Sequence, residues 1–171
     1  MKLKLNNDDA TTHFFEHTRL LGIVAPVKDY IFSWHANQQL GISLRLNNLL
    51  EIQLRKKNRD YFFSIFEYPV FVNNTFHYLY NNQYDGEYLL PEFKHLDFLW
   101  LVKTEGQDVD EGEFSILQKT LKTIPFVQLV TEMTGDKIKK PGAFNFLICF
   151  IAVLYKINLP SIILSVIFLL G

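Results

Sequence analysis

The chain has 171 residues, a hydrophobic fraction of 49% and a formal net charge of −1. This length is typical of one domain and allows a sizeable buried core. The 16 Phe, 8 Tyr and 2 Trp exclude a disordered chain, because they supply enough apolar surface to offset the entropy lost on folding. The balanced charge excludes a global attraction to nucleic acid or to anionic lipid.

The cysteine content and the N-terminus bear on the compartment. Cys149 is the single cysteine, so the chain has no internal disulfide and no cysteine pair for zinc. A lone cysteine suits a reducing compartment. Residues 1–10 lack the apolar stretch that a secretory signal requires. We therefore expect a cytoplasmic protein.

The first part of the chain predicts one helix. Residues 2–5 predict a short strand, whereas 14–24 fit neither the helical nor the strand period cleanly. Pro26 suits a first helical position and Gly41 suits the residue after a last turn, so we expect a helix over 26–40. Its apolar residues recur at three- and four-residue steps and predict one buried stripe, made of Val27, Tyr30, Ile31 and Trp34.

The next segment changes to the period of a strand. Apolar and polar residues alternate over 50–55, which predicts a half-buried strand. Residues 56–60 predict a charged turn. Residues 61–68 are nearly all aromatic or β-branched and predict a second strand.

A hairpin and a central strand follow. The Asn pair at 73–74 predicts a turn between strands at 70–72 and 75–80, because Asn tolerates positive φ. Residues 96–102 are apolar on both faces except at Asp97, which predicts a strand covered on both sides.

A second helix and a last strand complete the pattern. The acidic residues at 110–113 suit the positive N-terminal end of a helix, and Pro125 ends it. The expected apolar stripe of this helix consists of Phe114, Leu117, Leu121 and Ile124. Residues 126–133 predict a final strand. The sum is an α+β fold, a mostly antiparallel sheet with about two packed helices.

The segment 90–98, which reads L-P-E-F-K-H-L-D-F, resembles a bacterial family named for its I-P-E-x-x-x-V-D-Y motif. Three further stretches are similar to that family in matching order. They are L-G-I at 21–23 with D-Y at 29–30, F-S-I-F-E-Y at 63–68, and N-F-L-I at 145–148. The resemblance covers roughly residues 1–150. The interval between Tyr80 and Leu90 is short for the family, and about twenty residues follow the expected end.

The resemblance implies a compact cytoplasmic domain and no particular chemistry, because the family has no assigned activity or catalytic residues. The 90–98 motif itself offers two carboxylates, Glu92 and Asp97, as candidate binding residues. A buried carboxylate needs a partner. For Asp97 the structural alternatives are Arg19, Arg45, a tyrosine hydroxyl or backbone N–H groups. The functional alternative is a perturbed acid in a cleft.

Two other motifs suggest metals. H-F-F-E-H at 13–17 matches the H-x-x-E-H pattern of inverted zinc peptidases, which requires a helix for both histidines to reach one ion. The acidic run at 108–113 resembles a calcium loop, but position twelve is Lys119 rather than Glu. A chance match and a charged helix start explain these patterns better. We predict no metal, no cofactor and no catalytic residue.

The aromatic run at 59–66, with Arg55, Lys56 and Lys57 beside it, is similar to the ring-bearing strand of RNA-recognition sheets. Both glycines of that motif are missing, and rings in a strand usually form core. Nucleic-acid binding is therefore a secondary hypothesis.

The C-terminal segment is strongly apolar. We expect a domain over 1–143 and a hydrophobic tail over 144–171, with Lys156 as the tail's only charge. A transmembrane anchor needs about 20 apolar residues, but a central lysine costs about 2.5–3.5 kcal/mol. One alternative is a core strand at 144–150 with a sticky peptide or a partner-binding helix at 159–170. The other is a frameshift or read-through product past about residue 150.

The leading hypothesis is a cytoplasmic, non-catalytic module that binds an unknown protein partner. An RNA-binding sheet and a module tethered to the inner membrane by residues 144–171 are the alternatives.

Overall fold

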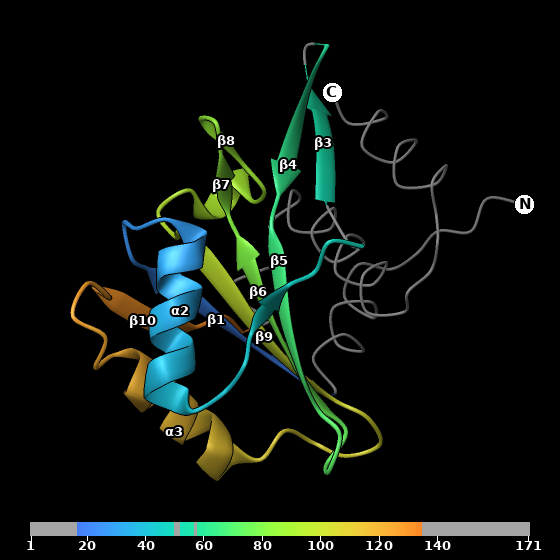
Figure 1. The fold of residues 1–171 in the computed structure, drawn as a ribbon, viewed down its shortest axis with the longest axis vertical. Helices are drawn as coiled ribbons and strands as arrows, with labels where there is room; N and C mark the ends of the chain where they lie inside the picture. Colours follow the sequence, from blue (N-terminus) through green and yellow to red (C-terminus); the bar gives the residue numbers. More distant parts are fainter. Residues whose placement is uncertain (1–16, 50–51, 57, 135–171) are drawn as a thin grey trace, which may run out of the picture.

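A computed structural model describes residues 17–49, 52–56 and 58–134 of the protein (Figure 1). The expected strand at 2–5, Cys149, the 145–148 stretch and the 144–171 tail lie outside the described residues. Within the described residues, no helix has both the length and the apolar character needed to cross a membrane.

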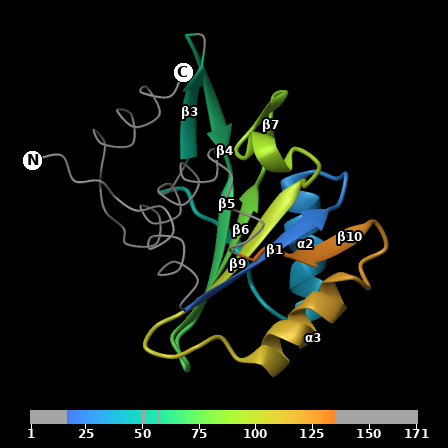
Figure 2. The same ribbon diagram turned by 180° about the vertical axis from the view of Figure 1, so that it is seen from behind.

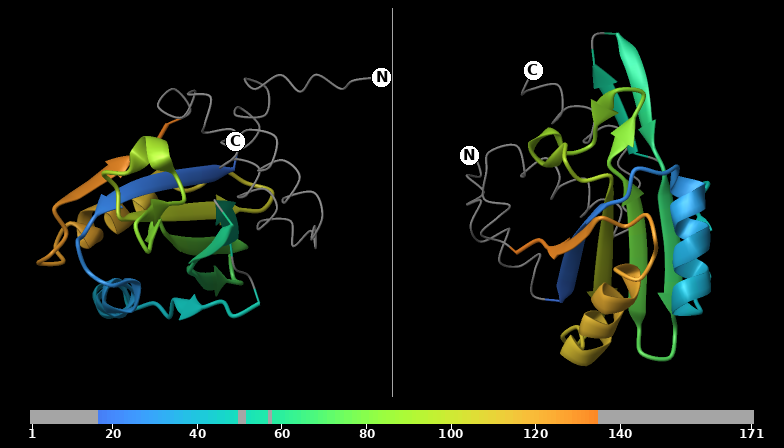
Figure 3. Two further views of the ribbon diagram at one scale, coloured as in Figure 1. Left: turned by 90° about the horizontal axis from the view of Figure 1, so that it is seen from above. Right: turned by 90° about the vertical axis from the view of Figure 1, so that its left-hand side faces the viewer.

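The described residues form an α+β fold, as predicted. Its main sheet has six antiparallel strands in the order β10-β1-β9-β6-β5-β2. The strands are β1 (Thr18–Val24), β2 (Arg45–Leu46), β5 (Ile65–Val70), β6 (Thr75–Asn81), β9 (Phe98–Thr104) and β10 (Leu129–Glu132). The helices α2 (Asp29–Leu40) and α3 (Glu111–Leu121) pack on one face of this sheet (Figures 1 and 3).

Two small hairpins and one 3₁₀ turn extend the fold at one end of the main sheet (Figure 2). The hairpins are β3 (Ile52–Lys56) with β4 (Arg59–Phe63), and β7 (Gln83–Tyr84) with β8 (Glu87–Tyr88). The 3₁₀ turn η1 (Pro91–Phe93) follows β8 and leads into β9. The sequence pattern predicts none of the four short elements β2, β7, β8 and η1.

The strand β9 lies in the middle of the main sheet, and the prediction of a central strand covered on both faces is confirmed. Trp100 faces Leu21 of β1 on one side and Leu79 of β6 on the other, and all three are fully buried. Trp100 packs in the core beneath the helices, whereas Leu99 and Leu101 pack in the core of the opposite face. A continuous apolar run is what such a position demands.

The predicted strand at 61–68 is two strands that belong to different sheets. Strand β4 ends at Phe63 and β5 begins at Ile65, so the chain leaves the β3–β4 hairpin at Ser64. The residues on both sides of the break favour extended backbone, so composition alone gives no signal for the change of partner.

The predicted Asn hairpin turn is confirmed, with a longer loop than expected. Asn74 has φ of 48°, the left-handed conformation that the turn requires. Strand β5 ends at Val70, so Phe71 and Val72 lie in the turn with 78% and 99% of their surface exposed.

The first predicted helix exists, but its expected start and its expected buried face are both wrong. It begins at Asp29 after Lys28 rather than at Pro26, and it ends as predicted at Gly41, whose φ is 65°. The residues that face the core are Phe32, Ser33 and Ala36. Phe32 stacks on Phe98 of β9 with 4.6 Å between ring centroids. Because Phe32 faces the sheet, two residues of the predicted stripe, Tyr30 and Trp34, face solvent instead.

The second predicted helix is confirmed as α3, but it ends at Leu121 rather than at Pro125. All four residues of the predicted stripe are buried, although Ile124 lies beyond the end of the helix. Asp110 caps its first turn, where its carboxylate accepts the Glu113 N–H at 2.7 Å. The acidic run at 108–113 is therefore the charged start of a helix.

Arg19 joins α3 to the edge strand β10. Its Nε donates to Glu132 Oε1 at 2.6 Å and its Nη1 donates to Glu111 Oε2 at 2.5 Å, while the guanidinium lies over the Phe114 ring. The bonds to Glu132 and then to Glu111 raise the pKa of Arg19. Arg19 is thus engaged with these two carboxylates, and it is not the partner of Asp97.

Candidate functional site

One buried amide, Asn82, holds the 90–98 motif in place. Its Nδ2 donates to the carbonyl oxygens of Phe93 at 3.0 Å and Leu96 at 2.8 Å. Its Oδ1 accepts the backbone N–H of Leu90 at 2.8 Å. Because Asn82 is fully buried, these bonds replace water for the five polar groups that they join, two on the Asn82 amide and three on the backbone. The amide therefore fixes the loop that contains η1.

Asp97 is tied to the end of β1 through backbone groups. Its Oδ2 accepts the Ala25 N–H at 2.7 Å, and its own N–H donates to the Ile23 carbonyl at 2.9 Å. Of the partners that the sequence left open for Asp97, the described structure shows the backbone N–H. The carboxylate thereby pins the start of β9 to the chain that leaves β1.

The prediction that Asp97 lies inside the strand at 96–102 is wrong, because Asp97 lies at a bend and β9 begins only at Phe98. Strand alternation begins only at Phe98. As a result Leu96 packs with Leu99 in one core, whereas Phe98 packs in the other core, beneath α2.

Two of the stretches that resemble the family meet in space. A Cβ atom added at Gly22 would lie 2.5 Å from Leu96 Cδ1, so the absence of a side chain at residue 22 makes room for Leu96. With the Asp97 bonds to Ile23 and Ala25, the 90–98 motif packs directly along the 21–25 stretch. These contacts give the motif an architectural role.

Replacing Asp97 tests that role. Asp97→Ala is expected to cost about 2 kcal/mol of unfolding free energy, because it leaves the buried Ala25 N–H without an acceptor. Asp97→Asn should cost about 1 kcal/mol or less, since the amide oxygen still accepts that bond. Urea unfolding of both variants measures the difference, and equal losses would show that the Ala25 bond is not what Asp97 contributes.

Glu92 lies in η1, apart from the Asp97 bonds. Its Oε2 is shielded from solvent and has no hydrogen-bond partner among the described residues. The two carboxylates of the motif, Glu92 and Asp97, therefore form no hydrogen-bonded pair among the described residues. Glu92 is also absent from the described lining of the open cleft that Asp97 lines.

Asp97 also lines an open cleft of about 450 Å³ between the start of α2 and the β7–β8 hairpin. The cleft is polar, and its other lining residues include Lys28, Asp29, Tyr84 and Asp85. Asp85 is already paired with Arg59 of β4. The carboxylates of Asp97 and Asp85, two of the three in the described lining of the cleft, are therefore both engaged in structural contacts.

The outward face of α2 begins at the rim of that cleft. Tyr30 follows Asp29 and is 65% exposed, and Trp34 lies one turn further on and is 58% exposed. Residues four apart share a helix face, so the two rings lie on the same side of α2. Large exposed aromatic side chains are typical of binding surfaces, where Tyr and Trp contribute most.

The rings that suggested RNA recognition lie largely in the core. Tyr61, Phe63 and Phe66 are buried, and Phe62 is half-buried. Phe63 and Phe66 pack in the two different cores of the main sheet. These positions are those expected if the 59–66 run is a packing element, since base stacking requires exposed ring faces.

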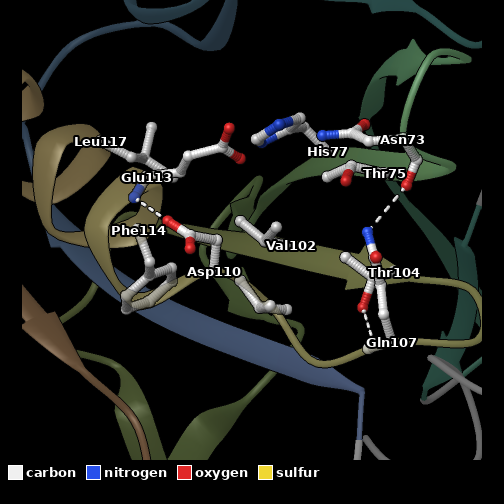
Figure 4. A pocket seen from close by; sticks show the side chains of 11 residues that line it. Asn73, Thr75, His77, Val102, Thr104, Gln107, Asp110, Glu113, Phe114 and Leu117 are labelled. Atoms are coloured by element: carbon white, nitrogen blue, oxygen red, sulfur yellow. Dashed lines mark hydrogen bonds between the residues drawn. The ribbon is translucent and has the colours of Figure 1, made fainter.

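A second hollow, a pocket of about 200 Å³, lies between α3 and the sheet (Figure 4). Here the Trp100 indole N–H donates to His77 Nδ1 at 3.2 Å. Burial lowers the pKa of His77 to about 4, so its ring is neutral at neutral pH. The sequence around His77 predicts no role for it, because its partner is 23 residues away.

The predicted zinc motif falls mostly outside the described residues, since only His17 of the 13–17 segment is described. His17 Nδ1 lies 3.2 Å from Asp108 Oδ1. In the described ranges, no three His, Cys, Asp or Glu side chains gather closely enough to hold a metal ion.

Two comparisons with known proteins found no match. No model of a known protein family matches the chain, and no curated protein matches it either.

Proposed function

We propose that this chain is a non-catalytic, cytoplasmic module that binds a protein partner through the outward face of α2. The observation that carries the proposal is the exposure of Tyr30 and Trp34 on one side of the helix. Folding gains nothing from leaving two such rings in water, whereas an interface gains a large, rigid contact area from them. The resemblance of the 90–98 motif to the IPExxxVDY family stays a prediction.

The cleft beside α2 extends the proposed surface. Lys28 and Asp29 line the cleft and directly precede Tyr30, so a partner that covers the two rings also reaches charged groups at the rim. An aromatic centre with a polar edge is the usual anatomy of a protein interface. The Asp97 carboxylate is engaged in a structural hydrogen bond to the Ala25 N–H. This contact supports a binding role for the cleft over acid–base catalysis by Asp97.

Photocrosslinking in the source cells tests this proposal. A photoreactive residue in place of Gln38, which is exposed on the same face one turn beyond Trp34, should capture one discrete partner. The double change Tyr30→Ala and Trp34→Ala should remove that product, because loss of one interface anchor weakens binding about 30-fold. The matched control places the photoreactive residue at Ile116, which is exposed on α3.

Equal capture at positions 38 and 116, or no product at either, would contradict the proposal. It would also fail if the purified protein turned over a small substrate and lost that turnover on Glu92→Gln or Asp97→Asn.

A further inference from the structure

In the pocket beneath α3, the hydrogen bond from Trp100 defines which ring nitrogen of His77 is a donor. The Trp100 indole nitrogen can only donate, so the His77 Nδ1 that receives its N–H carries no proton. In the neutral ring the proton therefore lies on Nε2. In the described part of the chain, no acceptor is hydrogen-bonded to that Nε2–H. His77 lines the pocket and thus offers it a fixed N–H donor.

An acceptor lies on the opposite side of the same pocket. Figure 4 shows the Glu113 carboxylate and the His77 ring directed toward one another, the first from α3 and the second from β6. Asp110 adds a second carboxylate at the start of α3, although one of its oxygens is occupied by the Glu113 N–H. None of the described lining residues is Lys or Arg. The pocket therefore disfavours anions.

The remaining walls are partly apolar. Val102 on the sheet wall and Phe114 and Leu117 on the α3 wall line the pocket and are buried. A volume of about 200 Å³ corresponds to roughly six or seven water molecules at about 30 Å³ each. A ligand that fits is smaller than the drug-sized molecules that occupy typical pockets.

We propose that this pocket binds a small neutral amide. Its carbonyl oxygen accepts the His77 Nε2–H, its N–H donates to the Glu113 carboxylate, and its short apolar tail packs on Val102, Phe114 and Leu117. A donor and an acceptor facing each other match the two adjacent polar ends of an amide. A carboxylate ligand would be repelled by Glu113, and an ammonium ligand would leave the Nε2–H without an acceptor. This site is separate from the proposed protein-binding face of α2.

Three ligands with the same four-carbon chain test the assignment, namely butyramide, butylamine and butyrate. Each is titrated into the full-length protein labelled with ¹⁵N, and the backbone amides of Thr75, His77 and Glu113 are followed by NMR. We expect saturable shifts for butyramide with millimolar affinity, as is reasonable for so small a ligand. Butylamine should bind several-fold more weakly, and butyrate should give no saturable shift.

Two variants and a control complete the test. Glu113→Ala should weaken butyramide binding about tenfold without unfolding the protein, because the Glu113 side chain is exposed and the Asp110 cap uses only its backbone N–H. His77→Phe should have a similar effect on binding. Lys119→Ala, on the exposed side of α3 and away from the pocket, should leave it unchanged.

Butyramide binding that is saturable, strongest of the three and lost in Glu113→Ala supports the amide site. Binding in which butylamine is strongest, binding that Glu113→Ala leaves intact, or no saturable shift with any of the three ligands overturns it.

Discussion

Asn82→Ala is expected to lower the free energy of unfolding by about 4 kcal/mol, a large share of the roughly 5–15 kcal/mol that holds a typical domain together. The change removes three hydrogen bonds inside the core and leaves the Leu90 N–H and the Leu96 carbonyl without a partner, whereas the Phe93 carbonyl still accepts the Leu96 N–H. Each orphaned buried group costs about 1–3 kcal/mol. Urea unfolding at neutral pH measures the loss.

Two further variants separate the amide's bonds from the mere presence of a side chain. Asn81→Ala is the matched control, because the Asn81 side chain accepts one exposed bond from the Gln83 N–H, and the loss of that bond should cost less than about 1 kcal/mol. Asn82→Asp keeps the acceptor for Leu90 but turns the donor into an oxygen that faces two carbonyls. It should therefore be at least as harmful as Asn82→Ala. Wild-type stability in Asn82→Asp would show that the bonds to Phe93 and Leu96 are not important.

The elements that the sequence predicted well are those in which burial and chain period agree. Strand β9 is apolar on both faces and is covered on both, and the stripe of α3 from Phe114 to Leu121 is the stripe that packs. Helix α2 fails this rule, because its most conspicuous apolar residues, Tyr30 and Trp34, are the ones left in solvent. A binding surface and a core face have the same signature in a helical period, so sequence alone assigns such a stripe to the core.

The groups that organise the candidate sites gave no local signal. Asn82 bonds to backbone groups 8, 11 and 14 residues away, and His77 bonds to Trp100 on the neighbouring strand. Such pairs form only once strand order and register are set. For Asp97 the need for a partner could be predicted, because a carboxylate beside an apolar run must be satisfied. The partner itself, the backbone N–H of Ala25, could not be predicted. It depends on the bend at Asp97, which the alternation of apolar and polar residues does not reveal.

Acidification from pH 7 to pH 4 is expected to remove about 3 kcal/mol of stability through His77 alone, since one pKa unit corresponds to about 1.4 kcal/mol. Burial lowers the pKa of His77 from 6.5 to about 4 in the folded protein. Between these two pH values the unfolded chain binds a proton that the folded chain does not. The stability is therefore complete above pH 6.5 and is lost as the pH falls toward 4.

His77→Gln isolates this contribution, because a glutamine oxygen can still accept the Trp100 indole N–H but does not titrate. The difference in unfolding free energy between wild type and His77→Gln should shrink by about 3 kcal/mol from pH 7 to pH 4, on top of the losses that both share from their carboxylates. Unfolding is followed by fluorescence in a Trp34→Phe background, so that Trp100 is the one reporting indole. Parallel losses in the two proteins would mean that His77 is protonated as readily when folded as when unfolded, and that burial does not control its charge.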